Sequence, residues 1–286
     1  MFASELARNA WLAGTFVALA CGTLGWFVVA RGQVFASDAF GHVAFVGAIA
    51  AATIGVDERV GLFALTLAAA GGLGIARRAP DRDPDVDDIG VGVALAWTLG
   101  VGALLLTILA TSANGASGVS AVNALFGSIW SLSSADAAIA AAVALAATGI
   151  VLSAARPLLL STLDPELAAL RGVPVKLLGL GFLGALAVVS AEGTQAVGAL
   201  LVLGLVATPA GAAARLTCRP ALGIALSASI AVGATWGGLA LSWAVTTLPA
   251  STAIVGLAAG AYALTALRAL PSARSARSAR RARGAG

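Results

Sequence analysis

Residues 34–55 of the chain read VFASDAFGHVAFVGAIAAATIG. This segment has about the length that a helix needs to cross a bilayer, roughly 20 mostly apolar residues. It nevertheless contains Asp38 and His42, and His42 is the only histidine in the 286 residues. A spacing of four residues places the carboxylate and the imidazole on one helix face, about one turn apart. Because an ionisable group at mid-bilayer costs roughly 2.5–3.5 kcal/mol on insertion scales, the pair predicts a functional site that suits a transition-metal cation or a proton.

The composition predicts an all-α integral membrane protein. Hydrophobic residues make up 59% of the chain and charged residues 10%, and the mean hydropathy is +0.97, far from the averages of soluble domains. The apolar runs are rich in Ala and Gly, which let helices approach closely, so we expect one tightly packed polytopic bundle. The candidate spans are 11–30, 34–55, 60–77, 89–110, 135–155, 176–192, 196–214, 221–246 and 251–268. Eight and nine spans both stay open, because the segment at 34–55 carries its polar residues near one end.

The basic charge of the chain belongs to its C-terminal end. The formal net charge is +4, but six arginines lie in the last 19 residues, so the remainder carries a charge of −2. This pattern argues against nucleic-acid binding by the whole protein. We predict a single transmembrane domain over residues 1–268 and a disordered basic tail over 269–286, which lies in the cytoplasm and touches anionic membrane lipid. Given a cytoplasmic tail, nine spans place the N-terminus outside and eight place it inside.

Two longer connections are expected to hold short helices. Residues 111–134 lie outside in this scheme and contain an apolar run at 120–130 that is too short to span, which indicates a re-entrant or interfacial helix. The cytoplasmic loop at about 156–176 contains Asp164-Pro165-Glu166, the pattern of an N-cap, a first-turn proline and an acidic first turn. Gly172 then predicts the end of this helix of about seven residues.

Three separated segments, in this order along the chain, resemble the permease subunit of ABC-type metal importers, the metal ABC transporter permease family. SDAFGHVAFVG at residues 37–47 is similar to the family's acidic-x-x-x-His segment, usually written G-D-A-x-S-H-A. LDPELAALRGVP at 163–174 resembles the D-P-E-x-A-x-x-x-G-V element that docks on the ATPase. QAVGALLVLGLVATPA at 195–210 resembles the family's Q-x-V-G-x-L-L-V-x-x-L-L-x-x-P-A run. Ser37 and Gly41 depart from the first pattern but leave both ligand types in place.

The resemblance implies roles for two groups of residues. Asp38 and His42 would line the translocation pathway and contact the metal, and the alternative is a hydrogen-bonded pair that only fixes helix packing. The coupling helix would transmit movements of a cytoplasmic ATPase to the bundle, and its alternative is an ordinary loop helix. The residues that carry the coupling pattern are Asp164, Pro165, Glu166 and Gly172.

Glu192 and Gln195 lie at the outer end of segments 176–192 and 196–214. Two polar residues beside a short connection are typical of a solvated loop. We therefore interpret them as a solvated loop pair and keep an outer gate as the alternative.

The resemblance also implies a whole assembly in a bacterial inner membrane. The chain would be the permease of an ATP-driven importer of Mn²⁺, Zn²⁺ or Fe²⁺ that works by alternating access, and both ligand types serve all three cations. Two ligands in each chain favour release of the ion over tight binding. No G-x-x-x-x-G-K-[ST] segment occurs, so the chain is not expected to be an enzyme, and ATP would be hydrolysed on two copies of a separate ATPase. A second permease copy and an extracytoplasmic metal-binding protein complete the expected assembly, in which no cofactor stays bound.

Two other functions stay open at this level. A proton-coupled secondary metal carrier could use Asp38 and His42 as a proton relay. A non-transporting membrane scaffold could assemble through its small-residue faces and basic tail, but it would leave the pair without a purpose.

Overall fold

The computed structural model describes residues 5–76, 84–111, 129–245 and 247–283, and every regular element in these ranges is a helix. The long helices are α1 (Glu5–Ala30), α2 (Val34–Thr53), α3 (Glu58–Ala76), α4 (Pro84–Thr111), α6 (Ser134–Ser153), α9 (Val175–Val197), α10 (Ala199–Leu216), α11 (Pro220–Ala244) and α12 (Ala250–Arg283). The short ones are η1 (Ile129–Ser131), α7 (Ala155–Leu163) and α8 (Pro165–Leu170). The predicted all-α class is confirmed.

Eight of the described helices are long and apolar enough to cross a membrane, and they are α1, α2, α3, α4, α6, α9, α11 and α12. The ninth apolar helix, α10, is shorter and contains Pro209. Each of the nine segments predicted from the sequence corresponds to one of these helices. The expected eight to nine spans are therefore eight full-length helices and one shorter helix.

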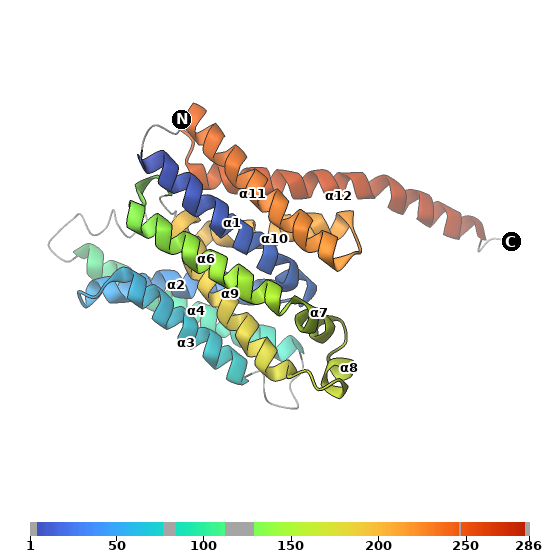
Figure 1. Ribbon diagram of the computed structural model, residues 1–286, viewed down its shortest axis with the longest axis horizontal. Coiled ribbons are helices and arrows are strands. Elements are labelled where there is room, and N and C mark those ends of the chain that lie inside the picture. The colour runs from blue at the N-terminus through green and yellow to red at the C-terminus, as the bar shows by residue number, and fades with distance from the viewer. Residues whose placement is uncertain (1–4, 77–83, 112–128, 246, 284–286) are drawn as a thin grey trace.

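Consecutive long helices run antiparallel, and the bundle has two distinct ends (Figure 1). One end carries the surface helices α7 and α8, and we call it the α7–α8 end. The opposite end holds the start of α1, where Asn9 Nδ2 donates to the Leu132 carbonyl at 3.3 Å, and a tilted pair of rings, Trp130 and Trp243, with centroids 5.9 Å apart. The two termini lie at opposite ends of the bundle (Figure 1), an arrangement that fits nine crossings.

Helix α1 lies in the middle of the bundle and packs against α6, α10 and α11. This close packing depends on glycine, since a Cβ placed on Gly22 would lie 2.6 Å from Ala228 Cα. A Cβ on Gly25 would collide with the Val206 carbonyl oxygen of α10. Ser227 Oγ on α11 donates to the Gly22 carbonyl at 2.6 Å, so the contact is fixed by a hydrogen bond as well as by shape.

The structure differs from the sequence-based expectation in its connections. The loop at 156–176 contains two helices, because α7 precedes the six-residue α8. Of the outer segment at 120–130, only the last residues, in η1, belong to the described part of the chain. The backbone of α12 stays helical to Arg283, over the range for which we expected a disordered tail. Alanine and arginine are both strong helix formers, which accounts for this continuation.

Candidate functional site

Asp38 and His42 lie in the second and third turns of α2, counted from the α7–α8 end. His42 Nε2 and Asp38 Oδ1 are 3.8 Å apart, too far for a hydrogen bond but close enough for a shared cation or an ion pair. The His42 side chain is 12% exposed and the Asp38 side chain is 26% exposed. His42 Nδ1 is buried without a hydrogen-bond partner in the described part of the chain. Neither the contact with Asp38 nor a contact at Nδ1 holds the imidazole by a hydrogen bond, so its ring nitrogens are not committed to a partner among the described residues.

The face of α2 that carries this pair becomes apolar and buried toward the opposite end of the bundle. Phe45 and Ile49 continue the same stripe by helical spacing, and they are 5% and 3% exposed. They form an apolar cluster with Ala199 of α10, against which residues of α4 pack. Exposure falls along the stripe from Asp38 to Ile49. The pair is therefore sealed from the opposite end by apolar side chains, and it lies on the side of α2 between α4 and α10.

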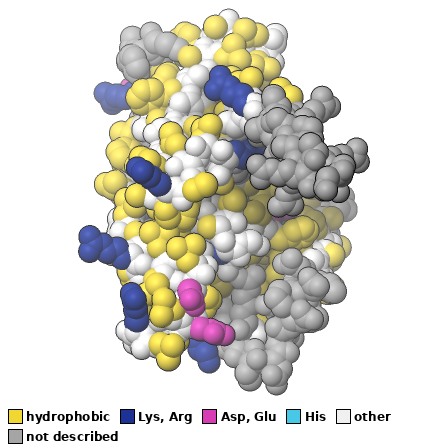
Figure 2. Space-filling model, turned by 90° about the vertical axis from the view of Figure 1, so that its right-hand side faces the viewer, with side chains coloured by type: hydrophobic (Ala, Val, Ile, Leu, Met, Phe, Trp, Pro, Cys, Tyr) yellow, Lys and Arg dark blue, Asp and Glu magenta, His cyan; other side chains and the backbone are white. Residues whose placement is uncertain are grey.

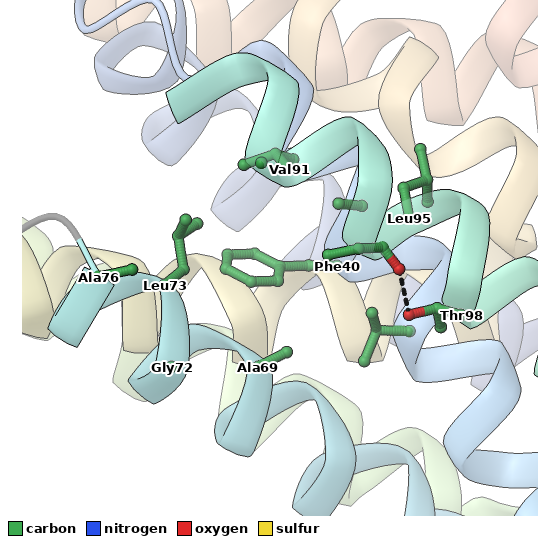
Figure 3. Close-up of a pocket in the computed structure, with 12 residues that line it drawn as sticks. Phe40, Ala69, Gly72, Leu73, Ala76, Val91, Leu95 and Thr98 are labelled. Atoms are coloured by element: carbon green, nitrogen blue, oxygen red, sulfur yellow. Dashed lines mark hydrogen bonds between the residues drawn. The ribbon is translucent and has the colours of Figure 1, made fainter. Parts of the chain in front are cut away.

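Two other faces of α2 pack against α9 and border an apolar cavity. Thr194 Oγ1 of α9 donates a hydrogen bond to the Gly41 carbonyl at 3.3 Å, and this bond fixes α2 against α9. Between α2, α3 and α4 lies a cavity of about 360 Å³ lined mostly by apolar side chains, among them Phe40 and Leu73 (Figure 3). The one hydroxyl on its wall, Thr98 Oγ1, donates to Ala94 O at 2.7 Å within its own helix. The described side chains that line this cavity offer no charged ligand for a cation.

Within the described residues, no group of three or more His, Cys, Asp and Glu side chains could hold a metal ion. Asp38 and His42 supply one oxygen and one nitrogen ligand, a combination suited to Mn²⁺, Fe²⁺ or Zn²⁺. Two ligands leave the remaining coordination positions to water or to another chain. Such an incomplete site suits an ion that must leave again.

The α7–α8 end presents a bounded helix with apolar side chains on its surface. Asp164 Oδ1 accepts from the Leu167 amide at 2.8 Å, and Pro165 occupies the first helical position, as the sequence predicts. Gly172 ends the helix with a φ of +77°, a conformation that favours glycine. Leu163, the last residue of α7, and Leu170, the last residue of α8, are 71% and 85% exposed.

Lys and Arg side chains are scattered over this end of the molecule, with a small group of acidic side chains among them (Figure 2). The exposed basic residues of the described loops and helix ends here are Arg156, Arg171, Lys176, Arg215 and Arg219. A concentration of basic residues at one end is typical of the cytoplasmic side.

The interpretation of Glu192 and Gln195 as a solvated loop pair is wrong. Glu192 lies inside α9 and is 1% exposed, and neither carboxylate oxygen has a hydrogen-bond partner in the described residues. Gln195 Oε1 accepts from Arg59 Nε at 3.2 Å, and Arg59 Nη1 lies 3.4 Å from Asp136 Oδ1. These four residues form a polar cluster that joins α3, α6 and α9 at the opposite end.

Arg59 was not singled out from the sequence, although a signal existed. An arginine in a connection on the outer side is an exception to the positive-inside pattern. Such an exception indicates an arginine that makes a specific contact, and Arg59 contacts Gln195 of α9 and Asp136 of α6.

The fold and the site together define the class of protein. It is a polytopic helical membrane protein with one polar pair on a partly exposed helix face and a short, capped surface helix at its basic end. The chain belongs to the ABC 3 transport family, whose sequence profile matches residues 3–269. This confirms the family to which the sequence motifs pointed.

Individual relatives agree with this assignment. The chain is 28% identical over 235 residues, 82% of its length and 78% of the relative's, to the manganese transport system membrane protein MntC of Halalkalibacterium halodurans. It is 23% identical over 206 residues, 72% of its length and 70% of the relative's, to the manganese import system permease protein ScaB of Streptococcus parasanguinis. Its fold is similar to a chain of PsaBC from Streptococcus pneumoniae in complex with Fab, with a TM-score of 0.79, 23% identity and coverage of 92% and 91% of the two chains.

Proposed function

We propose that this chain is the permease subunit of an ATP-driven importer of divalent transition-metal cations. The observation that carries the proposal is the Asp38–His42 pair, an oxygen and a nitrogen ligand 3.8 Å apart on a partly exposed face of a membrane-spanning helix. Among Mn²⁺, Zn²⁺ and Fe²⁺, manganese is the first to test, because relatives of the chain are named for manganese transport.

In this proposal the ion is cargo and is held only in passing. A second copy of the chain supplies another carboxylate and imidazole across a shared pathway, which completes the coordination that one chain leaves open. An extracytoplasmic binding protein delivers the ion to the opposite end. The apolar seal at Phe45 and Ile49 corresponds to a conformation whose outer side is closed, one of the two that alternating access requires.

The energy would enter at the α7–α8 end. Two copies of a cytoplasmic ATPase bind the surface around α8, where Leu163 and Leu170 offer exposed apolar contacts. The capped ends of α8 make it a rigid body. The residues that keep this body intact during ATPase closure are Asp164, Pro165, Glu166 and Gly172.

The polar cluster at the opposite end is a candidate outer gate. Arg59 ties Gln195 of α9 to Asp136 of α6, and the Glu192 carboxylate lies buried within the electrostatic reach of Arg59 and Asp136. Opening of the outer side would require these contacts to exchange. Glu192 is then the acceptor to which Arg59 turns when its present contacts break.

The test is metal uptake by proteoliposomes that contain the permease, its ATPase and its binding protein. Asp38→Ala and His42→Ala should each reduce manganese uptake to background, because each removes half of the ligands, while the amount of permease in the membrane stays unchanged. Phe35→Ala, an exposed residue at the start of the same helix, is the matched control and should transport normally.

Near-normal uptake by both ligand variants would refute the assignment. Uptake that follows an imposed proton gradient and needs no ATP would instead support the secondary-carrier alternative. Competition by Zn²⁺ and Fe²⁺ in the same vesicles identifies the preferred cation.

A further inference from the structure

Arg31 connects the two functional regions of the molecule. It follows the last residue of α1 and stands seven residues before Asp38. Its Nε donates to Thr162 Oγ1 at 2.8 Å, and its Nη2 donates to Ser161 Oγ at 2.8 Å. Both acceptors belong to the last turn of α7, directly before the cap residue Asp164. A single side chain thus connects the entry to α2 with the entry to α8.

The acceptors on α7 are oriented for this contact. Ser161 Oγ and Thr162 Oγ1 each donate their own proton to the Leu158 carbonyl, at 2.9 Å and 2.6 Å. Their remaining lone pairs are therefore free to accept from Arg31. The Leu158 carbonyl also lies 3.4 Å from Arg31 Nη2. Three oxygen atoms of the last turns of α7 thus accept from the Arg31 guanidinium.

The cation has no carboxylate partner within ion-pair distance among the described residues. It lies over the ring of Phe182 in α9, with Cζ 5.0 Å from the ring centroid, a cation–π contact. Burial lowers the pKa of Arg31 below its ordinary value, although a guanidinium stays charged. A half-buried cation held only by hydroxyls, a carbonyl and a ring is costly, which argues against a chance surface contact.

The α1–α2 turn that contains Arg31 and the α7–α8 junction that it contacts are both tightly connected. The turn after α1 is closed by Gln33 N donating to Val28 O at 2.9 Å, with Gly32 at a φ of +66°. The first turn of α2 starts from this turn, since Ser37 N donates to Gln33 O at 3.1 Å. On the other side, Asp164 ends α7 and caps α8, so the two helices share one residue. These contacts provide a continuous path along which a displacement of α8 would reach the turn and α2.

From this geometry we infer that Arg31 is a positioning residue that transmits movement of the α7–α8 unit to the helix that carries Asp38 and His42. The inference rests on the proposed function, because it requires an ATPase to move α8. It adds a contact that links the docking surface to the metal pair through α1 and α2, in parallel with the continuous chain from α8 into α9.

The experiment measures metal ions moved per ATP hydrolysed by the reconstituted complex. Arg31→Met keeps the length of the side chain but removes all donors, and it should lower this ratio about tenfold, as expected for the loss of charge-assisted hydrogen bonds, while ATP hydrolysis continues. Arg31→Lys should recover part of the ratio, since it keeps the charge but not the forked donor geometry. Arg219→Met, at an exposed arginine of the same end, is the matched control and should keep the wild-type ratio.

A second pair of changes tests the contact from its other side. Ser161→Ala with Thr162→Val removes the acceptors and leaves Arg31 in place, so it should lower the ratio to a similar degree. Combined with Arg31→Met, it should produce no further loss, because both remove one shared interaction. This variant also decides the question if Arg31→Met fails to accumulate in the membrane.

A wild-type ratio in Arg31→Met or in the acceptor variant would overturn the inference, as would losses that multiply when the variants are combined. Absence of ATP-dependent uptake by the wild-type complex would instead reject the proposed function. The two failures are therefore distinguishable.

Discussion

Asp38, His42 and Glu192 are ionisable side chains within predicted membrane spans, and they differ in their surroundings. The first two share a partly exposed face and lie within reach of one ion. Glu192 is fully buried, with two carboxylate oxygens that no donor satisfies in the described structure. A buried polar group without a partner destabilises the folded state. At the scale of single residues, exposure therefore distinguishes Asp38 and His42, which a metal ion could reach, from Glu192, which is buried without a hydrogen-bond partner among the described residues.

Replacement of Glu192 by leucine should stabilise the protein and impair transport. The change removes unsatisfied oxygens at similar volume, which we expect to raise the free energy of unfolding by about 1–3 kcal/mol. If Glu192 receives Arg59 when the outer side opens, Glu192→Leu should also slow uptake. Thermal unfolding of the purified permease and uptake by vesicles measure the two effects.

Glu192→Gln serves as the matched variant, because it retains the shape and an acceptor oxygen but no charge. It should leave thermal stability within the error of the wild type and slow uptake. If leucine at this position destabilises the fold, then the carboxylate is hydrogen-bonded in the folded protein and the gate proposal loses its basis.

At the scale of helices, the ends of α8 were predictable because caps are local. Asp164, Pro165 and Gly172 each act within a few residues, and the structure places all three where the sequence indicated. Helix α7 was missed because the residues after the predicted span at 135–155 were interpreted as a loop, although Pro157 lies in the first turn of α7. The break falls between Ser153 and Ala155, and the position of α7 depends on Arg31, which is more than 120 residues away.

Gly172→Ala should loosen α8 by placing a side chain in a left-handed backbone conformation. The expected cost is about 1 kcal/mol, enough to shift the end of α8 and weaken binding of the ATPase. Gly179→Ala is the matched control, because Gly179 lies in a helix with open space at its Cβ position. Copurification of the ATPase with each variant measures the effect; equal recovery from both would show that the end of α8 does not contribute to docking.

At the scale of the whole molecule, the sequence predicts which segments span but not which faces meet. Composition and length suffice for the spans, since each depends on local hydrophobicity. The apolar seal above His42 joins α2 to Ala199 and to residues of α4, and no local pattern encodes these contacts. The collision that glycine avoids at Gly25 is likewise set by a partner on α10. The four-residue spacing predicted that Asp38 and His42 share one helix face, where their side chains lie 3.8 Å apart, while the surroundings of the pair required the tertiary structure.

The orientation of the molecule can be tested with its two natural cysteines. Cys218 is exposed in the connection between α10 and α11, whereas Cys21 is buried in α1. If the basic α7–α8 end faces the cytoplasm, a membrane-impermeant thiol reagent should label Cys218 in inside-out vesicles and not in intact cells. Cys21 should stay unlabelled in both preparations until the protein is denatured, and Cys218→Ser should abolish the labelling. Labelling of Cys218 in intact cells would reverse the orientation, and it would place α8 on the side where no ATPase could reach it.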